Sequence, residues 1–131
     1  MTPSELRQRL AEFAKDIAAF TRPLLRSLET QDAARQLRRS SSSAAANHRA
    51  AGIPQSHSDF TSKIAIAAVE ADESLYWLRH LRDTHAVPIH TLAPLLNEAK
   101  QLSAILTKSY ETAKARDEAA KLQKQQRRRG R

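Results

Sequence analysis

Two acidic residues, Glu70 and Glu73, lie three positions apart, a spacing at which two carboxylates could carry out acid–base chemistry. Residues three apart lie on one face of a helix, where neighbouring carboxylates can divide the roles of general acid and general base. The basic residues Arg38, Arg39 and Arg49 precede them, on a segment that we expect to run antiparallel to theirs. An ion-pair network between the two segments is the preferred interpretation, and a catalytic carboxylate pair is the alternative.

The sequence offers no recognisable metal or cofactor site. No glutamate is followed three residues later by a histidine, and no two histidines are four positions apart as in the H-E-x-x-H zinc motif. The chain has two glycines and no cysteine, which excludes a glycine-rich phosphate loop and thiolate ligands. We therefore expect no cofactor and no enzymatic activity. The histidines are His48, His57, His80, His85 and His90.

Positive charge is concentrated at the C-terminal end of the sequence. The net charge is +8, and residues 114–131 contribute +6 of it, from eight lysines and arginines against Asp117 and Glu118. Such a field attracts phosphate backbones without reading a base sequence, although short basic tails can also be merely solubilising ends. The candidate nucleic-acid-binding residues are Arg127, Arg128, Arg129, Arg131, Lys121, Lys124, Arg79 and Arg82.

Helices must position all of these side chains. Alanine, leucine, glutamine, lysine and arginine dominate the composition, and apolar residues recur at steps of three and four in four separate segments. Short connections between amphipathic helices force antiparallel neighbours. We therefore predict an all-α protein, an antiparallel up-down-up-down four-helix bundle in residues 1–120. The predicted helices span residues 3–28, 31–51, 57–84 and 91–121, and residues 121–131 are predicted to form a basic, disordered tail.

Local signals fix some of these boundaries. Thr2 is expected to cap the first helix, and Pro23 to kink it or end it early. The serine run 40–43 is in phase with the apolar stripe of the second segment and is interpreted as helix. Gly52 should end that helix, and Thr91 is the expected cap of the fourth. Ser56 or Ser58 can cap the third.

Two further features concern packing between helices. Asn47 lies among alanines, where it is expected to hydrogen-bond a closely packed neighbouring helix. Tyr76 and Trp77 are adjacent, so both cannot face one core. One of them is expected at a helix edge, either packed under the fourth helix or anchoring a subunit interface. The predicted structural polar network comprises Arg39, Asn47, Arg49, Glu70 and Glu73.

Residues 36–51 and 56–81 together carry a resemblance to a known family. The matching features are Arg39-Ser40, Ser43, Ala46-Asn47, Arg49, Asp59-Phe60, Lys63 and the E-x-x-E-x-x-Y-W-L run from Glu70 to Leu78. This pattern resembles the four-helix-bundle proteins of 23S rRNA intervening sequences, and more distantly the accessory variability protein of diversity-generating retroelements. One departure is that Ala50 and Ala51 stand where many members have a glutamate.

The family resemblance implies a homopentamer without known enzymatic activity. The more distantly similar accessory variability protein binds a reverse transcriptase and nucleic acid. No run of about 20 apolar residues could span a membrane, and the sequence has no cysteine, so we expect a cytoplasmic protein. The preferred functional hypothesis is an oligomeric protein that binds RNA or DNA through its basic surface and tail. The alternative is a protein-interaction scaffold in an RNA–protein or reverse-transcriptase-type assembly, without direct contact to nucleic acid.

Overall fold

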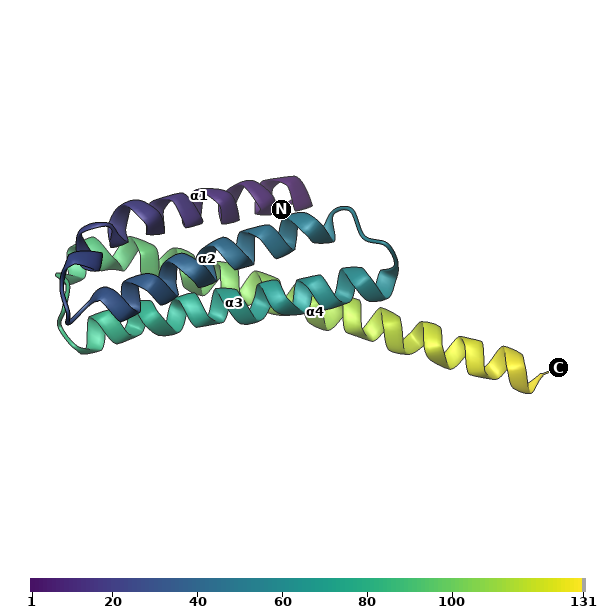
Figure 1. Cartoon of the computed structure of the whole chain (residues 1–131). Coiled ribbons are helices and arrows are strands. Elements are labelled where there is room, and N and C mark those ends of the chain that lie inside the picture. Colours follow the sequence, from purple (N-terminus) through teal and green to yellow (C-terminus); the bar gives the residue numbers. More distant parts are fainter. Residues whose placement is uncertain (131) are drawn as a thin grey trace.

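The computed structural model describes residues 1–130, and it is built from helices (Figure 1). Four long α-helices follow one another, with a short 3-10 helix after the first. Their bounds are α1 Pro3–Thr21, η1 Pro23–Arg26, α2 Gln31–Ala51, α3 His57–Asp83 and α4 Ile89–Arg129. The all-α class predicted from the periodicity is therefore confirmed.

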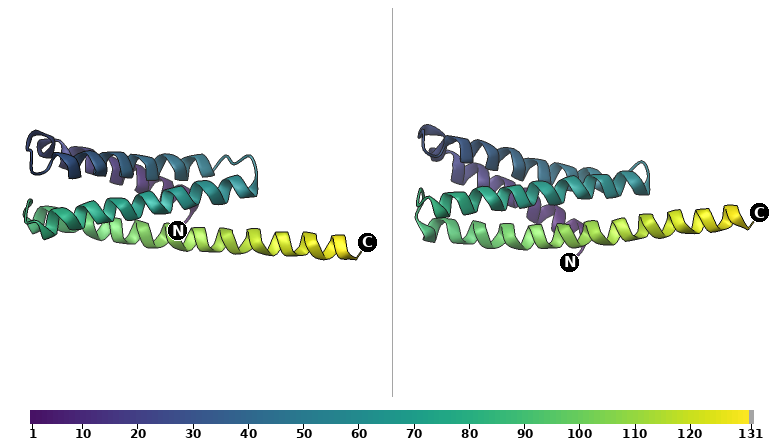
Figure 2. Two further views of the ribbon diagram at one scale, coloured as in Figure 1. Left: turned by 60° about the horizontal axis from the view of Figure 1, so that its bottom comes forward. Right: turned by 90° about the horizontal axis from the view of Figure 1, so that it is seen from below.

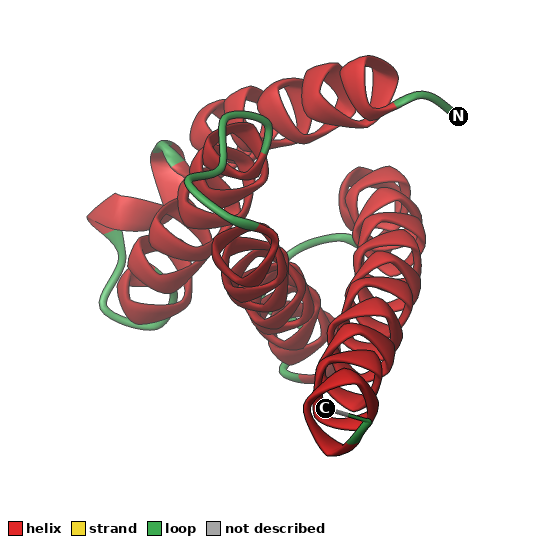
Figure 3. Cartoon of the chain, turned by 90° about the vertical axis from the view of Figure 1, so that its right-hand side faces the viewer, coloured by secondary structure: helices red, strands yellow, loops and turns green. Residues whose placement is uncertain are grey.

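Successive helices run in alternating directions, and α4 continues past the loop that joins α2 to α3 (Figure 2). Each α-helix packs against the next along the chain. α1 also packs against α4, which closes the bundle, and this is the least extensive contact between any two neighbouring α-helices. Figure 3 views this arrangement from the end at which α4 extends. The architecture is the predicted antiparallel four-helix bundle, with its loosest side between α1 and α4.

The first helix ends where proline interrupts it. Thr2 caps α1 as predicted, with its hydroxyl accepting a hydrogen bond of 3.1 Å from the Glu5 amide. At Pro23 the chain passes into the 3-10 helix η1, so the early end expected at this proline is confirmed and α1 stops short of the predicted bound at residue 28. Leu28, the last residue of that predicted helix, is 88% exposed because the helix that would have turned it inward has already ended.

Small side chains let α2 and α3 approach closely. The serine run is helical as predicted, and Ala44 and Ala67 are both almost completely buried. The hydroxyls of Ser40 and Ser74, on facing helices and fully buried, are joined by a hydrogen bond of 2.7 Å. A buried hydroxyl is stable only when it is paired, so this bond also fixes the register of the two helices.

The turn between α3 and α4 is a Schellman motif with a histidine at its left-handed position. His85 has a φ of 54°, and the Ala86 amide donates to the Leu81 carbonyl at 3.1 Å. α4 then begins at Ile89, two residues before Thr91, the predicted cap. Pro88 occupies the N-cap position instead, since its fixed φ suits the entry to a helix.

The end of α4 differs from the prediction. Residues 121–129, expected to be a disordered tail, continue the helix to Arg129, which makes α4 41 residues long. Alanine, lysine, glutamine and arginine are all strong helix formers, and no glycine or proline occurs between Pro94 and Gly130. An apolar stripe is therefore not needed to keep this segment helical.

No helix within residues 1–130 is long and apolar enough to cross a membrane.

Candidate nucleic-acid interface

The last buried residue of α4 is Ala113, and beyond it the helix leaves the bundle as a basic rod. We call residues 114–129 the α4 extension. It is about 24 Å long at 1.5 Å per residue, and its lysines and arginines are all exposed. Figures 1 and 2 show it projecting past the other three helices. A ligand could therefore reach its charges from several sides.

Three basic residues of the extension gather on one side. Lys121, Lys124 and Arg127 follow at intervals of three and thus share a face of α4. With His57 and Ser58 they line a groove of about 420 Å³. Because His57 and Ser58 are the first residues of α3, the partial positive charge of a helix N-terminus adds to that of the basic side chains. The groove is suited to an anion such as a phosphate group.

Asp117 lines the groove and Asp59 lies near it, and each has a partner of its own. His57 Nε2 lies 2.9 Å from the Asp117 carboxylate, which ties the start of α3 to the extension. Asp59 accepts hydrogen bonds from Lys63 at 2.7 Å and from the Gln55 amide at 3.1 Å. The Lys63 ammonium, followed by the Gln55 amide, holds the pKa of Asp59 below its usual range. These carboxylates are thus partly compensated before any ligand arrives.

The remaining candidate residues do not join this groove. Arg79 and Arg82 lie near the other end of α3, about 35 Å from His57 at 1.5 Å per residue. Arg82 Nε also donates to Asp83 at 2.8 Å, which compensates its charge. The candidate nucleic-acid-binding residues therefore lie at two opposite ends of the bundle. They were chosen by charge, and charge does not show at which end of the bundle a residue will lie. Arg131, also in the predicted set, lies outside the described residues.

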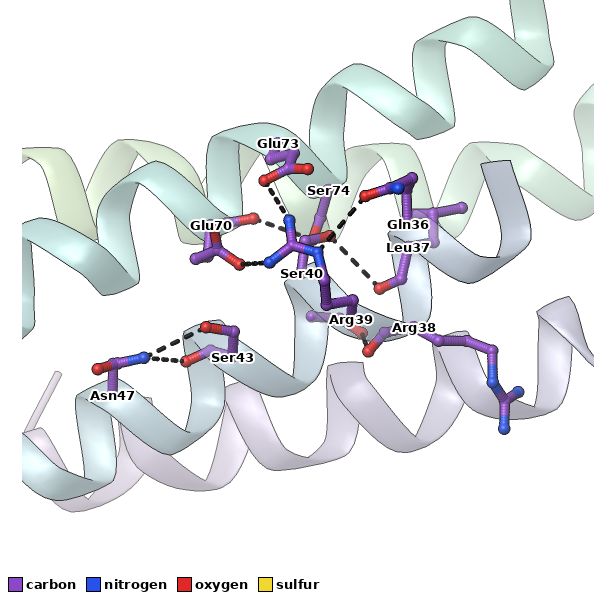
Figure 4. A network of polar contacts seen from close by, with 11 residues as sticks. Gln36, Leu37, Arg38, Arg39, Ser40, Ser43, Asn47, Glu70, Glu73 and Ser74 are labelled. Atoms are coloured by element: carbon purple, nitrogen blue, oxygen red, sulfur yellow. Dashed lines mark hydrogen bonds and ion pairs between the residues drawn. The ribbon is translucent and has the colours of Figure 1, made fainter. Parts of the chain in front are cut away.

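The predicted ion-pair network between α2 and α3 is present around one arginine (Figure 4). Arg39 donates to Glu70 at 2.9 Å and to Glu73 at 2.6 Å. Its guanidinium, chiefly through the hydrogen bond, holds the pKa of the Glu73 carboxyl below its usual range. Glu70 is almost fully buried, so it needs this charged partner, whereas Arg39 itself keeps about half of its side chain in solvent.

The other residues of the predicted network lie elsewhere. Asn47 donates to the Ser43 carbonyl of its own helix at 2.9 Å, and not to a neighbouring helix as expected. Arg38 points away from Arg39 (Figure 4) and donates to the Ala18 carbonyl of α1 at 2.8 Å. Arg49 is exposed and lines a groove between α1 and α2. A position on α2 is therefore not enough to join the network, because each face of the helix meets a different neighbour.

The carboxylate pair is arranged for ion pairing. A catalytic interpretation required Glu70 and Glu73 in an open pocket, whereas here both contact Arg39. In the described part of the chain, no three histidines, aspartates or glutamates gather closely enough to hold a metal ion.

The two adjacent aromatic residues divide as expected between core and surface. Trp77 is half-buried and packs against the core cluster, while Tyr76 is 59% exposed. Their rings meet edge to face with centroids 5.0 Å apart. Ile66 and Val69, exposed at 46% and 64%, continue the outward side of α3. We call Ile66, Val69 and Tyr76 the α3 stripe, and among residues 1–130 nothing covers it.

Sequence reasoning missed an ion pair that closes the loose side of the bundle. Arg9 of α1 donates to both carboxylate oxygens of Glu98 on α4. The two residues are 89 positions apart, and each is one of many charged residues on its helix. Only the register of the folded helices brings them together.

Comparison with known proteins places this bundle in a family. The family model described as 23S rRNA-intervening sequence protein matches residues 3–108. The chain belongs to this family. The 23S rRNA-intervening sequence proteins were the family that the motifs in residues 36–81 resembled, so that recognition is confirmed.

A solved structure gives the same architecture. This member of the 23S rRNA-intervening sequence protein family is similar to the crystal structure of a protein of unknown function from the S23 ribosomal protein family of Bacteroides thetaiotaomicron VPI-5482. The two are 28% identical with a TM-score of 0.77, and the match covers 85% of this chain and 99% of that one. No curated protein matches the chain. The family match ends at residue 108, before the α4 extension begins.

Proposed function

We propose that this protein is a non-enzymatic, oligomeric binding protein that holds RNA or DNA by its phosphates along the α4 extension. The observation that carries the proposal is the groove in which Lys121, Lys124 and Arg127 flank the N-terminus of α3. Regularly spaced cations on a projecting helix match the regularly spaced phosphates of a nucleic-acid backbone. His57 is the one aromatic ring among the residues that line the groove, and it stacks on Phe60. The groove thus has no series of rings on which successive bases could stack, and we expect binding that does not depend on sequence.

The salt dependence of binding tests this proposal. Contact with Z phosphates lowers log K with log salt at a slope of about −0.9Z for duplex DNA and about −0.7Z for single strands. With three or more phosphates in contact we expect a slope of about −2 to −3 or steeper, for labelled duplex DNA and single-stranded RNA measured by fluorescence anisotropy. A slope near zero, or no binding at about 50 mM salt, would contradict a phosphate-dominated mode.

We further propose that the α3 stripe is the surface through which the chain associates with itself, in the homopentamer that the family resemblance implies. Three large apolar side chains at helical spacing, left open to solvent, are typical of an interface. Five copies would carry about +30 on their C-terminal segments. Oligomerisation would thereby strengthen the binding of a long nucleic acid.

Substitution of Tyr76 by glutamate is expected to dissociate the oligomer. A carboxylate at the centre of an apolar interface would be desolvated without a partner, whereas on a free surface it costs little. Size-exclusion chromatography with light scattering should give a pentamer for the natural sequence and a smaller species for Y76E. The matched control is Gln123→Glu, on the exposed face of α4, which should leave the mass unchanged. A Y76E pentamer would contradict the assignment of this face.

The alternative function is a protein-interaction scaffold without direct contact to nucleic acid. Here the α3 stripe would capture a different protein, and Tyr76 and Trp77 would anchor it. The mass measurement distinguishes the two uses of the α3 stripe, because the scaffold hypothesis expects a stripe that is free in the isolated protein. The salt series decides separately whether nucleic acid is bound.

A further inference from the structure

A second cavity lies on the loose side of the bundle. It adjoins the basic groove at the start of α3, where Phe60 of the cavity stacks on His57 of the groove. It has a volume of about 200 Å³ and is bounded by the start of α1, the end of α2, α3 and the middle of α4. Its walls are mainly apolar, with Leu6, Phe60, Ile64 and Ile105 from three different helices. The proposed nucleic-acid interface uses none of these residues.

One wall of this cavity contains an incompletely satisfied polar group. His48 is 7% exposed, and its Nδ1 is the one buried side-chain nitrogen or oxygen within residues 1–130 that has no hydrogen-bond partner. Native proteins pair nearly all such atoms, since a buried polar atom without a partner destabilises the fold. Burial, and then the charge of Arg7, lowers the pKa of His48, so the imidazole is neutral near pH 7.

A guanidinium without a partner lies at the same cavity. Arg7 is an exposed residue, and its guanidinium forms no ion pair or hydrogen bond to any residue in the described range 1–130. Its position depends on Gly52, because a Cβ added to that glycine would lie 2.8 Å from Arg7 Nη2. The glycine thus leaves room for the guanidinium beside the C-terminal end of α2.

We propose that this cavity binds a small aromatic or compact aliphatic carboxylate, with its apolar body between Leu6, Phe60 and Ile64 and its carboxylate toward Arg7 and His48. The unpaired guanidinium selects an anion, and the apolar walls select a hydrophobic body. An apolar protein cavity of about 150 Å³ holds benzene. A space of about 200 Å³ is therefore suited to one ring with a carboxylate attached.

Three probes that share one ring test the proposal on the full chain. Benzoate, benzyl alcohol and benzylamine differ in charge but hardly in size, and the methyl signals of Leu6, Ile64 and Ile105 report cavity occupancy by NMR. We expect saturable shifts with benzoate and no shifts with benzylamine. Benzyl alcohol should bind at least about tenfold more weakly than benzoate, because charge-assisted hydrogen bonds are worth about 1.5–3 kcal/mol. Equal binding of all three probes, or no saturable shift with benzoate, would overturn the proposal.

Two substitutions locate the charge that selects the carboxylate. Arg7→Gln should weaken benzoate about tenfold or more and leave benzyl alcohol unchanged. Gly52→Ala keeps the charge but displaces the guanidinium, and it should weaken benzoate severalfold. The matched control is Arg22→Gln, an exposed arginine at the far end of α1. If this control weakened benzoate as much as Arg7→Gln, net charge alone would explain the binding and the site would be refuted.

Discussion

Replacement of Lys121, Lys124 and Arg127 together by glutamine is expected to weaken nucleic-acid binding about a hundredfold to a thousandfold at ~50 mM salt. Each residue carries a full positive charge on the groove face of the α4 extension. Loss of three phosphate contacts should also reduce the slope of log K against log salt by about 2 to 3. Glutamine keeps the helix propensity, so the extension itself should persist.

A matched control separates the groove from the overall field of the protein. Substitution of Lys15, Arg22 and Arg26 by glutamine removes the same charge from exposed positions on and after α1. This control should retain most of the affinity and nearly the full salt slope. Equal losses in the two variants would mean that nucleic acid responds only to net charge, and the groove would have no special role. Anisotropy titrations at several salt concentrations measure both quantities.

Replacement of Leu78 by alanine should lower the free energy of unfolding by about 2–5 kcal/mol. Leu78 is fully buried in α3 and belongs to the core that the helices share. Removal of its side chain forfeits apolar burial and leaves a cavity that closely packed helices cannot close. Such a loss is a large fraction of the stability of a domain of this size.

Leu122→Ala is the matched control, since it makes the same chemical change in the α4 extension, where Leu122 is 56% exposed. Urea denaturation followed by circular dichroism should place this variant within about 0.5 kcal/mol of the natural sequence. Similar losses for the two substitutions would mean that the extension packs on something, such as another copy of the chain. A small loss for Leu78→Ala would contradict the core described for α3.

The periodicity of apolar residues was sufficient to predict the bundle, because a helix can bury only one stripe. It gave the bounds of α2 as residues 31–51, which the structure has as Gln31–Ala51. The same spacing of three and four residues brings His48 to the inward side of that helix, where the structure buries it. The prediction failed at Leu28, where the spacing continued beyond a helix that Pro23 had already ended.

The candidate sites were only partly predictable, for a different physical reason. Arg39, Glu70 and Glu73 could be paired from sequence because their helices are neighbours and their charges are opposite. The cavity beside Arg7 and His48 gave no such signal, since it depends on how α1 packs against α4. The basic groove likewise needed the α4 extension to be helical. Its residues are good helix formers, but the apolar periodicity stops near Lys121, and for that reason the prediction ended the helix there.

The family match and the proposed function concern different parts of the chain. The match to the 23S rRNA-intervening sequence protein family covers residues 3–108, whereas the basic groove is formed mainly by residues 117–127. Nucleic-acid binding by the extension is therefore a proposal for this chain and is not inherited from the bundle. The bundle supplies the start of α3, which completes the groove.

The central claim is that nucleic acid contacts the α4 extension beside the start of α3. The most direct test is to add a short single-stranded RNA to the isotopically labelled full chain at low salt and to map the backbone amide shifts by NMR. We expect shifts concentrated in residues 114–130 and at His57 and Ser58, and their reversal by salt. Shifts confined to other faces of the bundle, or none at RNA concentrations well above that of the protein, would contradict it.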